Sequence, residues 1–269
     1  MRPLPLAGGG LGLLDRLPRR VSVLGGFSVG TGSAPPSIPA CRLIAFVALT
    51  GQPVARGHVA FSLWPDASEE HARRSLRTAL WAVRQCDPQL LAADDASVWA
   101  PSPIWLDLRT CGHDVAALVE WDTSDLSAAV DRYALSLLPG WYDDWLVLPR
   151  QRWDHARMHA LELISEELLG RGAHAPAVDA ASAAVAIEPM RETSRIALMR
   201  ALIAEGNLAQ ALAERRSLNH LLRSELGIES SVLVDEYLTS AVDGHALRPL
   251  GSQGMEQRRG RPVAHAAVS

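Results

Sequence analysis

The sequence contains no lysine, so all 26 of its basic residues are arginine. Cysteine is scarce as well: Cys41, Cys86 and Cys111 are widely spaced and form no CxxC motif. This usage indicates a reducing cytoplasm, the location we expect, in which the thiols act as small hydrophobic groups. No apolar run approaches the roughly 20 residues of a membrane helix. The N-terminus also lacks the apolar core of a secretory signal, so no membrane partner is expected.

Charge of either sign is moderate, and it is unevenly placed. The net charge of −4 argues against a protein that coats nucleic acid regardless of sequence. Residues 1–110 hold 11 arginines and 8 acidic residues, whereas residues 111–269 hold 15 arginines and 22 acidic residues. A mildly basic first part followed by an acidic second part fits a nucleic-acid reader joined to a protein-binding domain. The length of 269 residues accommodates two such domains.

The most informative segment is 68–85, which is typical of one amphipathic helix with Ser68 as its N-cap. Its apolar residues recur at spacings of three and four and form one stripe: Ala72, Leu76, Ala79, Leu80 and Val83. The rest of the helix surface carries the candidate DNA contacts Arg73, Arg74, Arg77, Thr78, Trp81 and Arg84. A helix fits the major groove, and arginine is its commonest reader of bases, so the segment predicts a recognition helix. The spacing alone fits an ordinary solvated helix face equally well.

Residues 19–109 contain the elements of a winged-helix DNA-binding domain in order. Short strands are expected at 21–24 and 27–29 around Gly25 and Gly26, with Ile38 on a return strand. Three helices follow, and the sequence predicts them at 42–50, 56–63 and 68–85. The segment 90–107 is typical of a β-hairpin that turns at Asp94 and Asp95, and it would form the wing. Ser97 and Trp99 are the candidate DNA contacts on this wing.

Residues 110–243 are predicted to form an all-α array that resembles tetratricopeptide repeats. Helices are expected at 114–120 and 125–137, with a long helix from Trp141 to about Gly170. Gly172 and Gly206 are 34 residues apart, and so are Ala177 and Ala211, which matches the tetratricopeptide period. The predicted fold class is therefore mainly α: a winged helix with short hairpins, then a helical array. Residues 1–18 are interpreted as a flexible leader, and residues 244–269 as a disordered basic tail.

Several strings resemble one family of transcription activators, the Streptomyces antibiotic regulatory protein family. They are W-P-D-A-S at 64–68, A-R-R-S-L-R-T-A-L at 72–80, L-L-P-G-W-Y-D-D-W at 137–145 and E-L-G-I-E at 225–229. The resemblance implies an OmpR-type winged helix followed by a bacterial transcriptional activation domain. It also implies binding to direct repeats in the promoters of biosynthetic gene clusters, recruitment of RNA polymerase and self-association on DNA. Arg73, Arg77 and Thr78 occupy the positions that match the family's recognition helix.

Three positions depart from the family pattern. Ala55 stands where a serine usually caps the second helix, so that cap is lost. Arg74 replaces a residue that is commonly small, which would alter the DNA sequence that is read. Ser230 replaces the usual proline after E-L-G-I-E. The rest of the match is unaffected by these changes.

Other function classes find little support in the sequence. His155 and His159 have the spacing of metal ligands on a helix, but their string lacks the glutamate that a zincin places beside its first histidine. We expect no catalytic residue, cofactor or metal in this chain. The alternative to a DNA-binding regulator is a tetratricopeptide-like protein-interaction adaptor whose winged helix no longer binds DNA.

Overall fold

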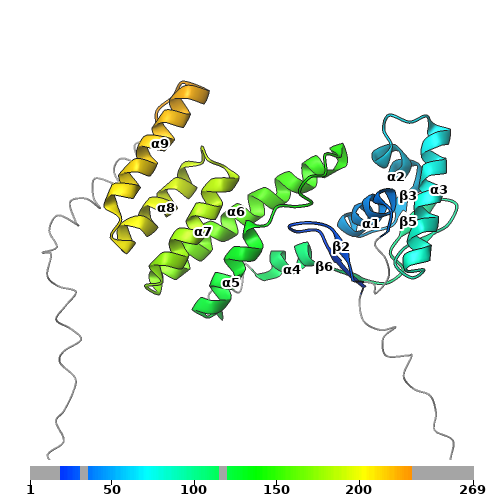
Figure 1. The fold of residues 1–269 in the computed structure, drawn as a ribbon, viewed down its shortest axis with the longest axis horizontal. Coiled ribbons are helices and arrows are strands. Elements are labelled where there is room, and N and C mark those ends of the chain that lie inside the picture. The colour runs from blue at the N-terminus through cyan, green and yellow to red at the C-terminus, as the bar shows by residue number, and fades with distance from the viewer. Residues whose placement is uncertain (1–18, 31–35, 115–119, 232–269) are drawn as a thin grey trace, which may run out of the picture.

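The computed structural model describes residues 19–30, 36–114 and 120–231, and it confirms a mainly α fold with short strands in its first part (Figure 1). The predicted leader, tail and end of the array, at 1–18, 244–269 and 232–243, lie outside the described residues. The first part holds β1 (Arg19–Ser22), β2 (Ser28–Val29), α1 (Ile38–Thr50), β3 (Val54–Ala55), α2 (Arg56–Leu63), α3 (Glu69–Cys86), β4 (Ala92–Ala93), β5 (Ser97–Trp99), β6 (Ile104–Leu106) and α4 (Asp107–Asp114). The second part holds α5 (Thr123–Ala134), the 3-10 helix η3 (Asp144–Leu146), α6 (Val147–Gly170), α7 (His174–Ile187), α8 (Glu192–Glu205) and α9 (Leu208–Leu226).

The helices of the first part follow the predicted pattern closely. Gly51 ends α1 in the left-handed conformation at φ 70°, which glycine adopts without steric cost. α2 keeps its predicted bounds, and no side chain caps its N-terminus at Ala55, as expected. The prediction of a return strand at Ile38 is wrong, because Ile38 opens α1. Pro39 follows it, and proline suits the first turn of a helix, where its missing N–H is not needed.

The strands form two small sheets, and here the sequence prediction needs correction. β5 pairs with β4 in the predicted hairpin, but it also pairs on its other side with β3. β6 does not continue this hairpin. It pairs in parallel with β1, in the sheet ordered β2-β1-β6. Pro101 and Pro103 separate β5 from β6, and residues without an N–H cannot extend a hairpin ladder.

The predicted boundaries of the elements after β6 are also shifted. The residue expected to end the hairpin, Asp107, begins α4 instead, and its carboxylate accepts hydrogen bonds from the N–H groups of Val23 (3.0 Å) and Leu24 (3.2 Å). The long helix expected from Trp141 starts at Val147, after an irregular corner and η3. Residues 115–119, within the helix expected at 114–120, lie outside the described residues. The glycine turns are confirmed: Gly172 and Gly206 have φ of 74° and 97°.

One buried core runs through both parts of the chain. It includes Val21 and Leu43 from the first part and Leu161 from α6. In Figure 1 the later helices extend away from the winged helix as a stacked array, with α9 at its far end. The described residues contain no helix long and apolar enough to cross a bilayer.

Candidate nucleic-acid interface

α3 is built as the sequence predicts. Ser68 is its N-cap, and the Ser68 hydroxyl oxygen accepts a hydrogen bond from the His71 N–H at 3.4 Å. Glu69 and Glu70 occupy the first turn, where the helix dipole favours negative charge. The buried residues of this helix are the five of the predicted stripe: Ala72, Leu76, Ala79, Leu80 and Val83. Packing of this stripe on the core fixes which side of α3 points outward.

The predicted DNA contacts on α3 all lie on its exposed surface. These are Arg73, Arg74, Arg77, Thr78, Trp81 and Arg84. The indole of Trp81 is 64% exposed, which is unusual for so large an apolar side chain. The structure therefore brings these six exposed side chains together on one helix. Whether they contact DNA stays a prediction.

The arginines on α3 differ in whether a carboxylate of the described residues pairs with them. Arg73 forms an ion pair with Glu69 at 2.6 Å, and Arg74 forms one with Glu70 at 3.0 Å, each between residues four apart. Arg77 and Arg84 form no ion pair with any other described side chain. Thr78 donates its hydroxyl to the carbonyl of Arg74 at 3.2 Å. Arg77 and Arg84 thus carry the uncompensated positive charge of this face.

The wing is the β4–β5 hairpin, and its turn is fixed by Asp94. The Asp94 carboxylate accepts hydrogen bonds from the backbone N–H groups of Ser97 (2.7 Å) and Ala96 (2.8 Å). These bonds hold the pKa of Asp94 below its ordinary value, so the turn keeps its negative charge. Ser97 and Trp99 lie on β5 and are half-buried. Trp99 also lines a hollow with Gly51 at the end of α1.

Two residues near this interface were not identified from the sequence. Arg56 begins α2 and donates from its guanidinium to the carbonyl of Asp94 in the wing at 3.0 Å, so it places a cation on the wing. Phe61 lies on α2 with 71% of its surface exposed. The pairing of β3 with β5 brings Arg56 to the wing, and a two-residue strand gives no sequence signal that would have revealed this. The inward face of α2 was predicted at Val59, Ala60 and Leu63, which are its buried residues, but Phe61 was assigned no role.

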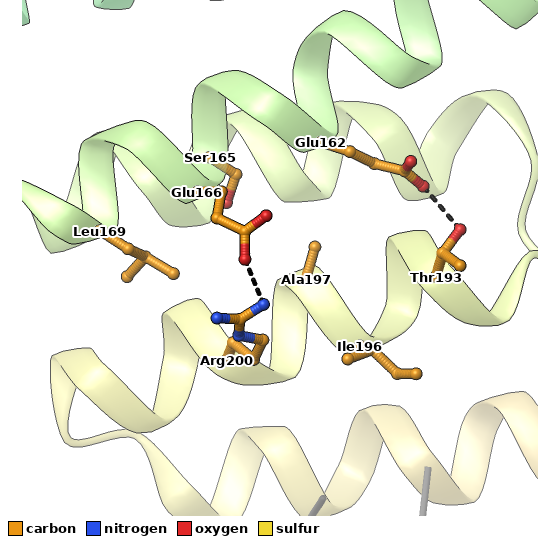
Figure 2. Close-up of a pocket in the computed structure, with 8 residues that line it drawn as sticks. All are labelled: Glu162, Ser165, Glu166, Leu169, Thr193, Ile196, Ala197 and Arg200. Carbon is orange, nitrogen blue, oxygen red and sulfur yellow. Dashed lines mark hydrogen bonds and ion pairs between the residues drawn. The ribbon is translucent and has the colours of Figure 1, made fainter. Parts of the chain in front are cut away.

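The helical array presents a groove between α6 and α8 (Figure 2). Leu169, Ile196 and Ala197 form its apolar part, and an ion pair between Glu166 and Arg200 spans it. At the other end, the Glu162 carboxylate accepts hydrogen bonds from the hydroxyls of Thr193 (2.8 Å) and Ser194 (2.6 Å) and from the Arg191 guanidinium (3.1 Å). Burial alone would raise the pKa of Glu162, but the three donors outweigh it and lower that pKa.

The histidines with metal-ligand spacing pack against each other. The rings of His155 and His159 are 4.5 Å apart and nearly perpendicular, and His159 Nδ1 lies 3.5 Å from the Glu162 carboxylate. Within the described ranges, no group of three or more His, Cys, Asp or Glu side chains is arranged to hold a metal ion.

Comparisons with known proteins add to this geometry. Residues 115–236 match the family described as bacterial transcriptional activator domain. The chain is 31% identical over 199 residues to the regulatory protein AfsR of Streptomyces coelicolor, a match that covers 70% of this chain and 20% of AfsR. It is 28% identical over 201 residues to AfsR of Streptomyces griseus, again over 70% of this chain and 20% of the relative. The chain thus spans about a fifth of the length of these relatives.

A solved structure shares the fold. Mycobacterium tuberculosis EmbR, in complex with a low-affinity phosphopeptide, superposes with a TM-score of 0.66 at 20% identity, over 84% of this chain and 65% of EmbR. The order of a winged helix and a helical array is therefore a known architecture.

Proposed function

We propose that this chain, which matches a bacterial transcriptional activator domain at 115–236 and is similar to AfsR, is a sequence-specific transcription activator of the Streptomyces antibiotic regulatory protein type. It binds direct repeats in the promoters of a biosynthetic gene cluster through α3 and recruits RNA polymerase through the helical array. A second copy binds the neighbouring repeat. The division into a DNA-binding domain at 19–109 and an activation domain at 110–243 belongs to this proposal.

One observation carries the proposal: the exposed surface of α3. It combines uncompensated guanidinium groups at Arg77 and Arg84 with an exposed hydroxyl and an exposed indole. Guanidinium forks recognise guanine in the major groove, and their charge also attracts phosphates. The buried stripe holds this surface outward, as a helix that enters a groove requires. We propose that the wing contacts the sugar-phosphate backbone of the DNA beside α3, through Ser97, Trp99 and Arg56.

The helical array is proposed to bind protein rather than DNA. Residues 111–269 carry 22 acidic residues against 15 arginines, so phosphates would repel this part. The groove between α6 and α8 offers apolar side chains rimmed by charged ones, as protein-binding surfaces of helical arrays do (Figure 2). An adaptor that does not bind DNA would use the same groove. DNA binding by α3 therefore distinguishes a transcription activator from an adaptor.

A transcription assay with purified bacterial RNA polymerase tests the proposal. A template that carries the upstream region of the cluster should give several-fold more transcript with the full chain than without it. The variant Arg77→Ala should lose this stimulation, because the activator no longer occupies the promoter. Stimulation that persists in Arg77→Ala would contradict recruitment through α3. If neither protein stimulates transcription and neither binds the template, the adaptor function is favoured.

A further inference from the structure

The two glutamates that open α3 are each held against an arginine of the next turn. Glu69 pairs with Arg73 at 2.6 Å and Glu70 pairs with Arg74 at 3.0 Å. The carboxylates are the more exposed partners, at 79% and 84%, and the guanidinium groups remain 61% and 63% exposed. Each pair is therefore a surface pair on the face that is proposed to meet DNA.

Such a pair separates two properties of an arginine. A guanidinium has five N–H donors, and a single contact with a carboxylate leaves most of them free to point outward. Its charge, however, is largely compensated by the carboxylate four residues away. Binding to DNA of any sequence depends on net positive charge, whereas reading of a base edge depends on donors in the right geometry. A paired arginine thus keeps its ability to read bases and loses much of its attraction for phosphates.

We propose that Glu69 and Glu70 are specificity-determining residues that reduce binding to non-operator DNA by compensating the charges of Arg73 and Arg74. This inference rests on the proposed DNA-binding function of α3. Arg77 and Arg84, which have no such partner among the described residues, supply the electrostatic attraction. The face is thereby divided into two arginines whose charge is compensated and two whose charge is not.

A simpler role for the glutamates is to stabilise the helix. Acidic residues in the first turn interact favourably with the helix dipole, and Ser68 already caps the same end. That role predicts a change in stability with no change in the preference for one DNA sequence over another. The two roles are therefore distinguished by binding measurements on two kinds of DNA.

The experiment compares the full chain with the variants Glu69→Gln, Glu70→Gln and the double variant. The probes are a duplex selected by the wild type from random sequence and a mixed-sequence duplex of equal length. Glutamine keeps the size and helix propensity of glutamate, and circular dichroism checks the fold. Each substitution should strengthen binding to mixed-sequence DNA about twofold, and both together about fourfold, as the worth of exposed i,i+4 pairs suggests. The slope of log affinity against log salt concentration should steepen by up to about 0.9 for each arginine whose charge is freed.

The preference for the selected duplex over mixed-sequence DNA should fall by the same factor of about four. The paired arginines already contact bases in the selected duplex, so we expect only the affinity for mixed-sequence DNA to rise. The control Glu225→Gln removes a carboxylate from the exposed surface of α9 and should change neither affinity. An unchanged or increased preference in the double glutamate variant would overturn the inference. If the wild type selects no sequence at all, the proposed function itself fails. If the wild type selects a sequence and the variants prefer it as strongly, only the inference about Glu69 and Glu70 fails.

A double-mutant cycle tests whether the carboxylate acts through its arginine. In an Arg74→Gln background, Glu70→Gln should have no further effect on binding to mixed-sequence DNA, because no charge remains to be released. A full twofold effect in that background would mean that Glu70 merely repels phosphates, and the pairing mechanism would be rejected.

Discussion

At the residue scale, function is proposed to depend on the partners that each charged side chain has. Arg73 and Arg77 are one helical turn apart and both exposed, yet among the described residues only Arg73 forms an ion pair with a carboxylate. Helical periodicity predicts the exposed side of α3 from sequence. The sequence also places Glu69 and Glu70 four residues before Arg73 and Arg74, but only the structure shows that both pairs form in this conformation.

Glu162 offers a residue-scale prediction on stability. Its lowered pKa means that the native state favours the charged carboxylate more than the unfolded chain does. This stabilisation is present above the ordinary glutamate pKa of about 4.3, and it is lost as the pH falls through the lower native value. Glu162→Gln should lower the free energy of unfolding by about 1–3 kcal/mol at pH 7, through the loss of charge-assisted hydrogen bonds.

Urea unfolding at several pH values checks this prediction. The gap between the wild type and Glu162→Gln should shrink as the pH falls below the ordinary glutamate pKa and the wild-type carboxyl becomes protonated as well. The exposed Glu205 provides the control, because Glu205→Gln should leave stability within about 0.5 kcal/mol. A gap that stays constant until the wild type unfolds in acid would show that the charge of Glu162 does not stabilise the array.

At the element scale, the long helices were predictable and the short strands were not. α3 spans 18 residues, so the periodicity of its apolar stripe alone identifies all five of its buried positions. β3 has two residues, and its place beside β5 depends on tertiary packing. The parallel pairing of β6 with β1 joins residues about 85 positions apart, such as Arg19 and Ile104, and no local pattern encodes it.

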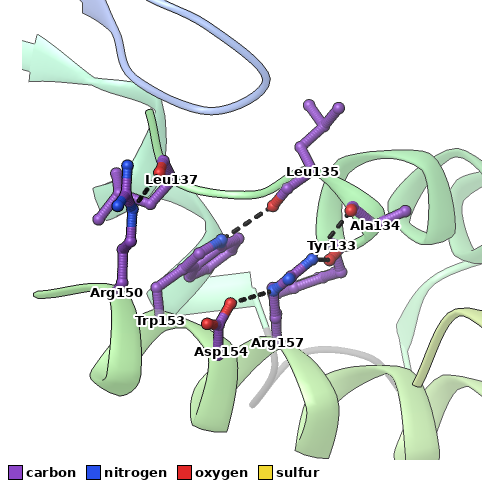
Figure 3. Close-up of polar contacts among 8 residues, drawn as sticks. All are labelled: Tyr133, Ala134, Leu135, Leu137, Arg150, Trp153, Asp154 and Arg157. Atoms are coloured by element: carbon purple, nitrogen blue, oxygen red, sulfur yellow. Dashed lines mark hydrogen bonds and ion pairs between the residues drawn. The ribbon is translucent and has the colours of Figure 1, made fainter. Parts of the chain in front are cut away.

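The candidate site shows the same division. Its α3 residues follow from helical periodicity, whereas the place of Arg56 on the wing follows from the non-local pairing of β3 with β5. The corner before α6 contains Trp141 and Trp145, at the residues where the sequence predicted the start of the long helix. The hydrogen bonds that hold the end of α5 and the residues after it against α6 could not be predicted (Figure 3). In that network Trp153 and Arg157 of α6 donate to the carbonyls of Leu135 (2.9 Å) and Ala134 (2.9 Å).

The missing cap of α2 gives the element-scale prediction. Ala55 has φ −58° and ψ 132°, close to the φ −60° and ψ 152° of Ser68, which caps α3. Ala55→Ser should therefore satisfy an open N–H of the first turn and raise the free energy of unfolding by about 0.5–1 kcal/mol. Ser68→Ala is the matched change and should lower it by a similar amount. Urea unfolding measures both, and a destabilising Ala55→Ser would contradict the capping argument.

At the scale of the whole molecule, the two parts of the chain are packed together. Phe46 of α1 meets Trp145 with ring centroids 5.2 Å apart, and Phe27 meets Trp141 at 5.5 Å. Arg42 of α1 forms an ion pair with Asp143 of the corner. A fragment that ends near Leu108 would lose all of these contacts and expose Phe46. Variants of the full chain therefore test function more cleanly than truncation.

The Arg42–Asp143 pair gives the prediction at this scale. Both side chains are largely buried, at 24% and 13% exposed, so loss of one charge leaves the other poorly solvated. Asp143→Asn should lower the free energy of unfolding by about 1–3 kcal/mol. The neighbouring Asp144 is exposed, so Asp144→Asn should change the free energy of unfolding by less than about 0.5 kcal/mol. Equal effects of the two substitutions in urea unfolding would show that the pair does not join the parts.

The central claim is that α3 reads DNA sequence, and selection from a pool of random duplexes tests it most directly. The wild-type chain should enrich one motif that is repeated in the same orientation. Arg77→Ala should bind that motif about 1–3 kcal/mol more weakly and relax the preference at one base position. Glu225→Gln should select the same motif as the wild type. Enrichment of no motif by the wild type, or an unchanged motif and affinity in Arg77→Ala, would contradict the account.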